Sequence, residues 1–215
     1  MHEVLPGIGI SEKDWAANEE KIERIKPFAK SVHIDICDGK FAPNETFLDP
    51  KPFAKYTQDI FFELHMMVEE PESYLEAWAK AGFRRFIGHV EKMSDQVSFV
   101  TKAEELGEVG LAVDGKTDLS AIKVDYQDLD TILIMTINAG FSGQSFQTSQ
   151  LDKVRQLSKK VFFPLEIDGG VNADTIKEGL DAGAKRFVST SFLFGENPSD
   201  RYQKLLEVIS DSSAE

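Results

Sequence analysis

Short apolar runs alternate with amphipathic, helix-like segments along the whole chain, and this alternation limits the folds open to it. The runs that predict strands are residues 4–10, 31–36, 60–65, 86–90, 109–113, 131–136, 162–167 and 186–189. The segments that predict helices are residues 12–29, 72–81, 94–106, 149–159, 173–182 and 199–209, with weaker ones at 52–56 and 119–124. Strands that alternate with helices favour a parallel sheet, and eight such units predict a closed (β/α)8 barrel, the TIM-barrel fold.

The length and composition fit one such barrel. The chain has 215 residues, of which 41% are hydrophobic and 28% charged, enough for one domain with a substantial core. We expect residues 1–209 to form a single barrel domain. Residues 210–215 read as a polar C-terminal tail that frays.

Charge and cysteine usage narrow the range of functions. A net charge of −13 argues against a nucleic-acid partner, which needs a basic surface. No apolar run approaches the roughly 20 residues that span a bilayer, so no membrane association is expected. The single cysteine, Cys37, excludes an intrachain disulfide, and the N-terminus lacks the pattern of a secretory signal. These features indicate a cytoplasmic protein.

Four metal-type side chains lie at or near the ends of three apolar runs. His33 and Asp35 are two positions apart in the second run, so in a strand they project from the same face. His65 ends the third run, and Asp168 directly follows the seventh. Because functional groups of a (β/α)8 barrel gather at the carboxyl ends of its strands, we expect all four to meet at one rim. The alternative is that each caps a helix or satisfies a turn separately.

Two imidazoles and two carboxylates suit a borderline divalent cation such as Zn²⁺, Fe²⁺, Mn²⁺ or Co²⁺. We therefore predict one such ion per chain. It could bind a 2-keto, 3-hydroxy fragment and polarise the carbonyl, so that removal of the adjacent proton gives an enediolate held by the metal. Asp35 and Asp168 belong to different strands. One could remove the proton and the other return it on the opposite face, which inverts the carbon.

A glycine-rich stretch follows the sixth run, and further small residues follow the seventh and eighth. Glycine lets backbone N–H groups approach an anion, although a plain tight loop is the alternative. Loops after strands seven and eight commonly form the phosphate site of such barrels. The residues expected at a phosphate are Gly140, Phe141, Ser142, Gly143, Gly169, Gly170, Thr190 and Ser191.

Other residues near strand ends have two readings. Met67 and Met135 are either core filler or an apolar lining that keeps water from the intermediate. Cys37 is interpreted as a packed thiol, because no base is evident beside it. His89 ends the fourth run. It is either a donor behind the metal ligands or, as we interpret it, a rim histidine satisfied by other partners.

The chain resembles the ribulose-phosphate 3-epimerases in motifs that follow in order along nearly its whole length. The matching segments are residues 33–39 with 43–44, 65–68, 135–138 with 140–144, and 166–171. The resemblance implies a (β/α)8 barrel of the ribulose-phosphate-binding type that interconverts D-ribulose 5-phosphate and D-xylulose 5-phosphate. It implies that His33, Asp35, His65 and Asp168 bind the metal, and that Asp35 and Asp168 transfer protons.

The resemblance also implies a substrate site and an assembly. The substrate contacts that carry over are Gly7, His65, Met67 and Met135, together with the eight phosphate residues named above. Family members are often homo-oligomers, but no stretch of this sequence can be assigned to an interface.

Several positions around the site depart from the family pattern. Gly7 replaces a usual substrate-contacting serine and Thr190 a usual glycine. The other departures are Cys37 for a usual methionine, Ala139 for a usual proline, and Asp114-Gly115 for a usual Asn-Pro. We predict a high KM for D-ribulose 5-phosphate, which Gly7→Ser or Asp114→Asn should lower, or a preference for another ketose phosphate. The alternatives are an epimerase of a hexulose 6-phosphate, a barrel that binds a sugar phosphate without turnover, and a metal-free phosphate-binding barrel.

Overall fold

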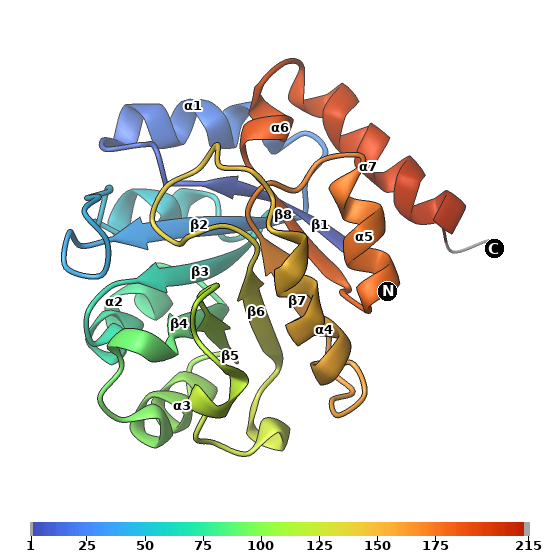
Figure 1. Cartoon of the computed structure of the whole chain (residues 1–215). Coiled ribbons are helices and arrows are strands. Elements are labelled where there is room, and N and C mark those ends of the chain that lie inside the picture. Colours follow the sequence, from blue (N-terminus) through green and yellow to red (C-terminus); the bar gives the residue numbers. More distant parts are fainter. Residues whose placement is uncertain (1, 213–215) are drawn as a thin grey trace.

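Eight parallel strands form a closed barrel in the computed structural model, which describes residues 2–212. The strands are β1 (Glu3–Ile8), β2 (Ser31–Cys37), β3 (Phe61–Met67), β4 (Arg85–His89), β5 (Glu108–Val113), β6 (Thr131–Met135), β7 (Leu165–Asp168) and β8 (Arg186–Ser189). Each strand pairs with the next along the chain, and β8 closes the barrel against β1 (Figure 1). The predicted (β/α)8 barrel is therefore confirmed.

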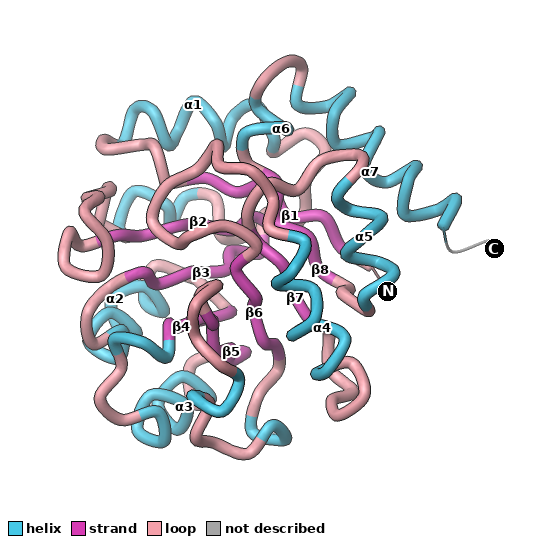
Figure 2. Tube along the Cα trace, in the orientation of Figure 1, coloured by secondary structure: helices cyan, strands magenta, loops and turns pink. Residues whose placement is uncertain are grey.

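Helices and short 3-10 turns connect the strands around the outside of the barrel (Figure 2). The helices are α1 (Trp15–Ile25), α2 (Leu75–Lys80), α3 (Gln96–Glu104), α4 (Leu151–Leu157), α5 (Thr175–Ala182), α6 (Ser191–Phe194) and α7 (Pro198–Ser212). The 3-10 turns are η1 (Lys51–Lys55), η2 (Pro71–Tyr74), η3 (Val90–Lys92), η4 (Leu119–Ala121), η5 (Tyr126–Asp128) and η6 (Thr148–Gln150). Within residues 2–212, no helix combines the length and the apolar character needed to cross a bilayer.

Several predicted segments have different bounds, for local reasons. The helix expected over 12–29 begins only after Asp14, whose carboxylate accepts the Ala17 N–H at 2.9 Å and caps it. The seventh strand begins after Pro164 rather than at 162, because proline has no N–H for the ladder. The weak helices expected at 52–56 and 119–124 are 3-10 turns.

The C-terminal end also differs from the expectation. Helix α7 continues to Ser212, so residues 210–212 are helical where a frayed tail was expected. Residues 213–215 of that expected tail lie outside the described residues.

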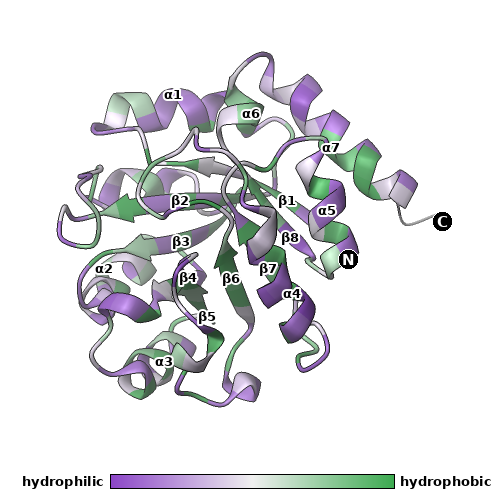
Figure 3. Cartoon of the chain, viewed as in Figure 1, coloured by the Kyte–Doolittle hydropathy of each residue, from purple (hydrophilic) through white to green (hydrophobic). Residues whose placement is uncertain are grey.

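Most of the apolar core lies between the barrel and the surrounding helices. Figure 3 shows apolar residues concentrated along the strands and polar residues on the outward faces of the helices. Two smaller apolar clusters lie apart from this core: Ile87, Ala112, Leu133, Met135 and Ile137 in one, and Ile10, Cys37 and Met67 in the other. Both include residues at the carboxyl ends of strands, beside the predicted site.

The parallel register brings the predicted site residues to one height in the barrel. Asp35 pairs with His65 between β2 and β3, and Met135 pairs with Asp168 between β6 and β7. Paired positions are direct neighbours across the ladder. Residues more than a hundred positions apart in the sequence therefore meet at the carboxyl rim.

Candidate active site

The structure brings His33, Asp35, His65 and Asp168 together at this rim, with one donor atom of each within 4.8 Å of the others. His33 Nε2 lies 3.3 Å from Asp35 Oδ1, and His65 Nδ1 lies 2.8 Å from the same oxygen. His65 Nδ1 is also 3.7 Å from Asp168 Oδ2. All four residues are buried. The predicted convergence is thus present in the fold, while the role of these residues as ligands stays a prediction.

The spacing of these donor atoms fits a divalent cation. Nitrogen and oxygen ligands that lie about 2.0–2.2 Å from a shared ion are about 3 Å apart from one another. Two imidazole nitrogens and two carboxylate oxygens also match the donor chemistry of Zn²⁺, Fe²⁺, Mn²⁺ and Co²⁺. The cluster can therefore hold one such ion without a large rearrangement.

The two carboxyl groups differ in acidity. Burial raises the pKa of Asp35, but the charge of His33 and hydrogen bonds from His33 and His65 outweigh it, so the pKa falls to about 2. Burial and the charge of Asp35 raise the pKa of Asp168 to about 6. Asp35 is therefore ionised over the neutral range, whereas Asp168 retains a proton to higher pH.

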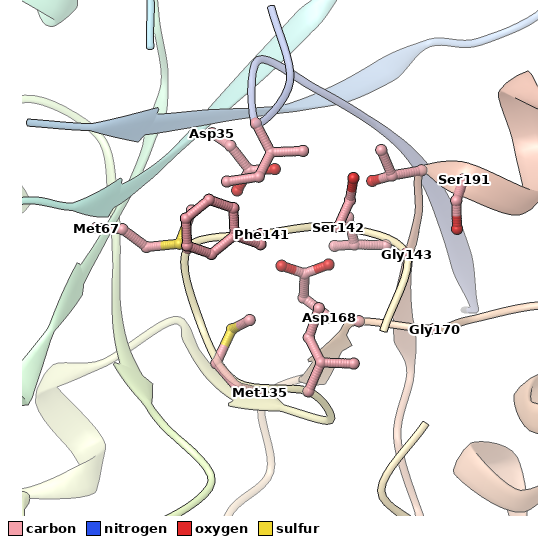
Figure 4. A pocket seen from close by; sticks show the side chains of 15 residues that line it. Asp35, Met67, Met135, Phe141, Ser142, Gly143, Asp168, Gly170 and Ser191 are labelled. Carbon is pink, nitrogen blue, oxygen red and sulfur yellow. The ribbon is translucent and has the colours of Figure 1, made fainter. Parts of the chain in front are cut away.

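A pocket opens above the cluster, and Figure 4 shows the carboxyl groups of Asp35 and Asp168 entering it from opposite sides. Phe141, which is 45% exposed, lies at its mouth. The lining residues are Ile10, Asp35, Met67, Met135, Ile137, Gly140, Phe141, Ser142, Gly143, Asp168, Gly169, Gly170, Val188, Thr190 and Ser191. All eight predicted phosphate residues belong to this lining, as do Met67 and Met135.

The loop after β6 is fastened over this pocket by side-chain amides. Gln144 Nε2 donates to the carbonyl oxygens of Asn138 at 2.7 Å and Phe141 at 2.8 Å. Asn44, a buried residue, donates to the carbonyls of Gly140 and Ile10 at 2.9 Å each. Sequence reasoning assigned no role to Asn44, because its partner in the loop is 96 positions away.

Two predicted rim residues are not part of the pocket lining. Gly7 is buried in β1 and does not line the pocket; a Cβ there would overlap the hydroxyl of Thr190, which does. Asp114 is also absent from the lining, and its Oδ1 accepts the Ala139 N–H at 3.1 Å. The expectation that Gly7→Ser or Asp114→Asn lowers KM stays a prediction, and the overlap with Thr190 argues against it at position 7.

A second set of polar side chains supports the two histidines from behind, and sequence reasoning missed most of it. Glu63 Oε1 lies 2.5 Å from His33 Nδ1, and Arg85 pairs with the other oxygen of Glu63 at 2.5 Å. His89 Nε2 lies 2.9 Å from His65 Nε2, so the interpretation of His89 as a rim histidine apart from the ligands is wrong. The signal for Glu63 was its position two residues before His65, on the same strand face.

Cys37 matches its interpretation as a packed thiol. Its side chain is fully buried against Met67, with the two sulfur atoms 4.0 Å apart. Burial raises the pKa of the Cys37 thiol above its ordinary value, which suppresses the reactive thiolate.

The fold and the cluster together place the chain among (β/α)8 barrels that carry a buried histidine and aspartate set at the carboxyl rim. More narrowly, the chain belongs to the ribulose-phosphate 3-epimerase family, whose profile matches residues 7–194. The ribulose-phosphate 3-epimerase of Bacillus subtilis (strain 168) is 33% identical over 97% of this chain and 98% of its own length. The enzyme of that name from Schizosaccharomyces pombe is 35% identical over 84% of this chain and 82% of its own.

Solved structures of other barrel enzymes share the fold. The 3-keto-L-gulonate-6-phosphate decarboxylase of Vibrio cholerae superimposes with a TM-score of 0.73 at 14% identity, over 98% of this chain and 97% of its own. The Pyrococcus furiosus thiamine phosphate pyrophosphorylase gives 0.66 at 16% identity, over 98% and 96%. At these identities the likeness concerns the fold alone.

Proposed function

We propose that this protein is a metal-dependent epimerase that inverts C3 of D-ribulose 5-phosphate to give D-xylulose 5-phosphate. The observation that carries the proposal is the entry of two carboxyl groups, Asp35 and Asp168, into one pocket from opposite sides. Membership of the ribulose-phosphate 3-epimerase family supports the choice of substrate. A single buried cysteine suits the cytoplasm, where we place the enzyme.

We assign one divalent ion to His33, Asp35, His65 and Asp168. When bound, the ion polarises the substrate carbonyl and stabilises the negative charge that develops on oxygen when the C3 proton leaves. Zn²⁺, Fe²⁺, Mn²⁺ and Co²⁺ all suit this mixed nitrogen and oxygen set.

The two carboxyl groups divide the proton transfer between the two faces of C3. One carboxylate takes the proton from C3, which leaves a planar enediolate. The other carboxyl group, already protonated, delivers its proton to the opposite face and completes the inversion. The pKa of Asp168, raised to about 6, makes it the more readily protonated of the two groups, whereas the pKa of Asp35, about 2, favours its carboxylate form.

The remaining lining residues orient the substrate. Met67 and Met135 give the pocket apolar walls beside the reacting carbon, which disfavours water and unwanted protonation. We assign the phosphate to backbone N–H groups of the two glycine-rich loops, with Thr190 and Ser191 completing the contact. The four glycines of these loops have φ angles between 69° and 114°, which glycine adopts without strain.

The test is exchange of the C3 proton of ketose phosphates in D2O, followed by NMR. The purified protein, in its metal-loaded form, should replace the C3 proton of D-ribulose 5-phosphate by deuterium while D-xylulose 5-phosphate accumulates. A chelator should abolish the exchange, and added Zn²⁺, Fe²⁺, Mn²⁺ or Co²⁺ should restore it.

Each other outcome of the same assay would overturn the proposal in a defined way. Exchange restricted to a hexulose 6-phosphate would identify a different epimerase. Binding of D-ribulose 5-phosphate without exchange would identify a non-catalytic sugar-phosphate barrel. If the chelator does not change the exchange rate, the reaction does not depend on a metal ion.

A further inference from the structure

A chain of hydrogen-bonding groups leads away from the metal cluster on the side of His65. His65 Nδ1 faces Asp35, at 2.8 Å, while its other ring nitrogen lies 2.9 Å from His89 Nε2. His89 Nδ1 in turn lies 2.9 Å from Glu91 Oε2. The other oxygen of Glu91 accepts the Asp114 N–H at 2.7 Å. His65 and His89 are both fully buried, so water cannot substitute for these contacts.

Only one arrangement of protons gives every one of these hydrogen-bonding groups a partner when His65 binds a cation through Nδ1. The single proton of a neutral His65 must then sit on Nε2 and point at His89. His89 must accept it at Nε2, so its own proton sits on Nδ1 and points at Glu91. Glu91 as a carboxylate accepts that proton, and it accepts the Asp114 N–H with its second oxygen. Every donor in the chain meets an acceptor.

We infer that His89 and Glu91 are positioning residues: Glu91, through His89, holds His65 in the tautomer and ring orientation that present Nδ1 to the metal. The inference rests on the proposed metal-dependent function. The same logic appears at the second histidine, where Glu63 contacts Nδ1 of His33 at 2.5 Å and leaves Nε2 facing Asp35. Hydrogen-bonded partners of this kind typically change metal affinity or activity about 10–100-fold when they are removed.

The backbone explains why Glu91 can act as a fixed anchor. It follows β4 by two positions in η3, and its bond to Asp114 N ties it to the residue immediately after β5. A glutamine at position 91 keeps the shape but has one acceptor oxygen for two donors. Glu91→Gln must therefore leave either His89 Nδ1–H or Asp114 N–H opposite an amide group.

The decisive measurement is the affinity of the metal-free protein for Zn²⁺, by competition with a chromophoric chelator. Glu91→Gln should weaken binding about 10–100-fold. Asp130→Asn is the matched control, because Asp130 accepts a backbone N–H of β5 at 2.8 Å, from Val109 at the opposite end of that strand. The control should bind Zn²⁺ like the unaltered protein. Unchanged affinity in Glu91→Gln, or an equal loss in Asp130→Asn, would overturn the inference.

A second measurement needs no substitution and stays decisive even if Glu91→Gln fails to fold. In Zn²⁺-loaded protein labelled with 15N-histidine, NMR should show a proton on His65 Nε2 and on His89 Nδ1, with a scalar coupling between the two Nε2 atoms. A proton on His89 Nε2 would contradict the assignment. Failure of the proposed function is a separate outcome. If the protein shows this proton pattern and normal Zn²⁺ affinity but exchanges no C3 proton, the inference about His89 and Glu91 stands and the proposed epimerase activity is wrong.

Discussion

Gly7 and Thr190 compete for one small volume between β1 and β8. A Cβ on Gly7 would overlap the Thr190 hydroxyl and would lie 3.0 Å from Val188 Cγ1. Thr190 lines the pocket, whereas Gly7 does not. The hydroxyl on this wall therefore comes from the end of β8, and glycine at position 7 leaves it room. Compared with the family pattern, the hydroxyl group of this wall is therefore on residue 190 instead of residue 7.

This pair gives the first prediction. Thr190→Val keeps the volume but removes the hydroxyl, so KM for D-ribulose 5-phosphate should rise. The loss of one hydrogen bond costs about 0.5–1.5 kcal/mol, or about two- to twelvefold in KM. Gly7→Ser should also raise KM, because it displaces the Thr190 hydroxyl, and the double variant Gly7→Ser with Thr190→Gly should recover part of the loss.

Steady-state kinetics of these variants separate the explanations. Thr190→Ser is the control that keeps the hydroxyl, and Gly7→Ala with Thr190→Gly fills the space without one. If Thr190→Val leaves KM unchanged, or if the alanine and serine double variants behave alike, the wall contributes shape but no hydrogen bond.

The second prediction concerns the carboxyl pair. Asp35→Asn and Asp168→Asn should each abolish epimerisation, because inversion needs a proton-transfer group on both faces. Loss of a general acid or base costs about 10²–10⁴-fold in rate, and loss of a ligand adds to this. The conversion of D-ribulose 5-phosphate to D-xylulose 5-phosphate should be measured at saturating Zn²⁺, with the metal content of each variant determined. A variant that holds the metal and epimerises at the normal rate would contradict its assignment.

At the scale of elements, the loop after β6 depends on side chains from far along the sequence. Asn44 joins the carbonyl of Ile10, beyond β1, to that of Gly140 in the loop. Asn44→Ala would leave both carbonyls without this donor, so we expect the loop to open more often and KM to rise while kcat changes less.

Hydrogen exchange followed by mass spectrometry tests the loop prediction directly. Residues 138–144 should exchange faster in Asn44→Ala, with the barrel strands unchanged. Asn18→Ala is the matched control: Asn18 is also buried and donates its amide to a backbone carbonyl, that of Asp14 at 2.8 Å, but in α1. Equal exchange of the loop in both variants would show that Asn44 does not hold it.

Periodicity and strand ends carry the part of this fold that can be predicted from the sequence. Alternating apolar runs indicate the barrel, and the ends of the third and seventh runs place His65 and Asp168 at one rim. Contacts between side chains of different elements cannot be predicted from these patterns. The contact of Asn44 with Gly140 depends on barrel closure, which brings distant loops together, and the contact of His89 with His65 depends on how the side chains of the neighbouring strands β3 and β4 meet. The early start predicted for the seventh strand gave too little weight to Pro164.

At the scale of the whole molecule, a layer of charged groups lies toward the amino ends of the strands, beneath the cluster of His33, Asp35, His65 and Asp168. Arg85 joins Glu63 to Glu108, at 2.5 and 2.7 Å, and Arg186 pairs with Glu3 at 3.2 Å. Glu166, fully buried, has no hydrogen-bond partner for either carboxyl oxygen within residues 2–212, although His33 Nδ1 lies 3.4 Å from one of them. Burial and the charge of Glu63 raise the pKa of Glu166 to about 8.

This raised pKa sets how stability depends on pH in the metal-free protein. Between the ordinary glutamate value of 4.5 and about 8, folded Glu166 keeps a proton that the unfolded chain has released. The folded state binds more protons in this window, so Glu166 makes the free energy of unfolding fall as pH rises. Glu166→Gln, a neutral shape-matched side chain, should remove that part of the slope. Urea unfolding at pH 5 and pH 8 should therefore show that Glu166→Gln is more stable relative to the unaltered protein at pH 8 than at pH 5. Glu207→Gln, on the exposed face of α7, is the control, and its stability relative to the unaltered protein should be the same at both pH values. If the difference in free energy of unfolding between Glu166→Gln and the unaltered protein is the same at both pH values, Glu166 is ionised in the folded barrel and the neighbouring charges compensate it.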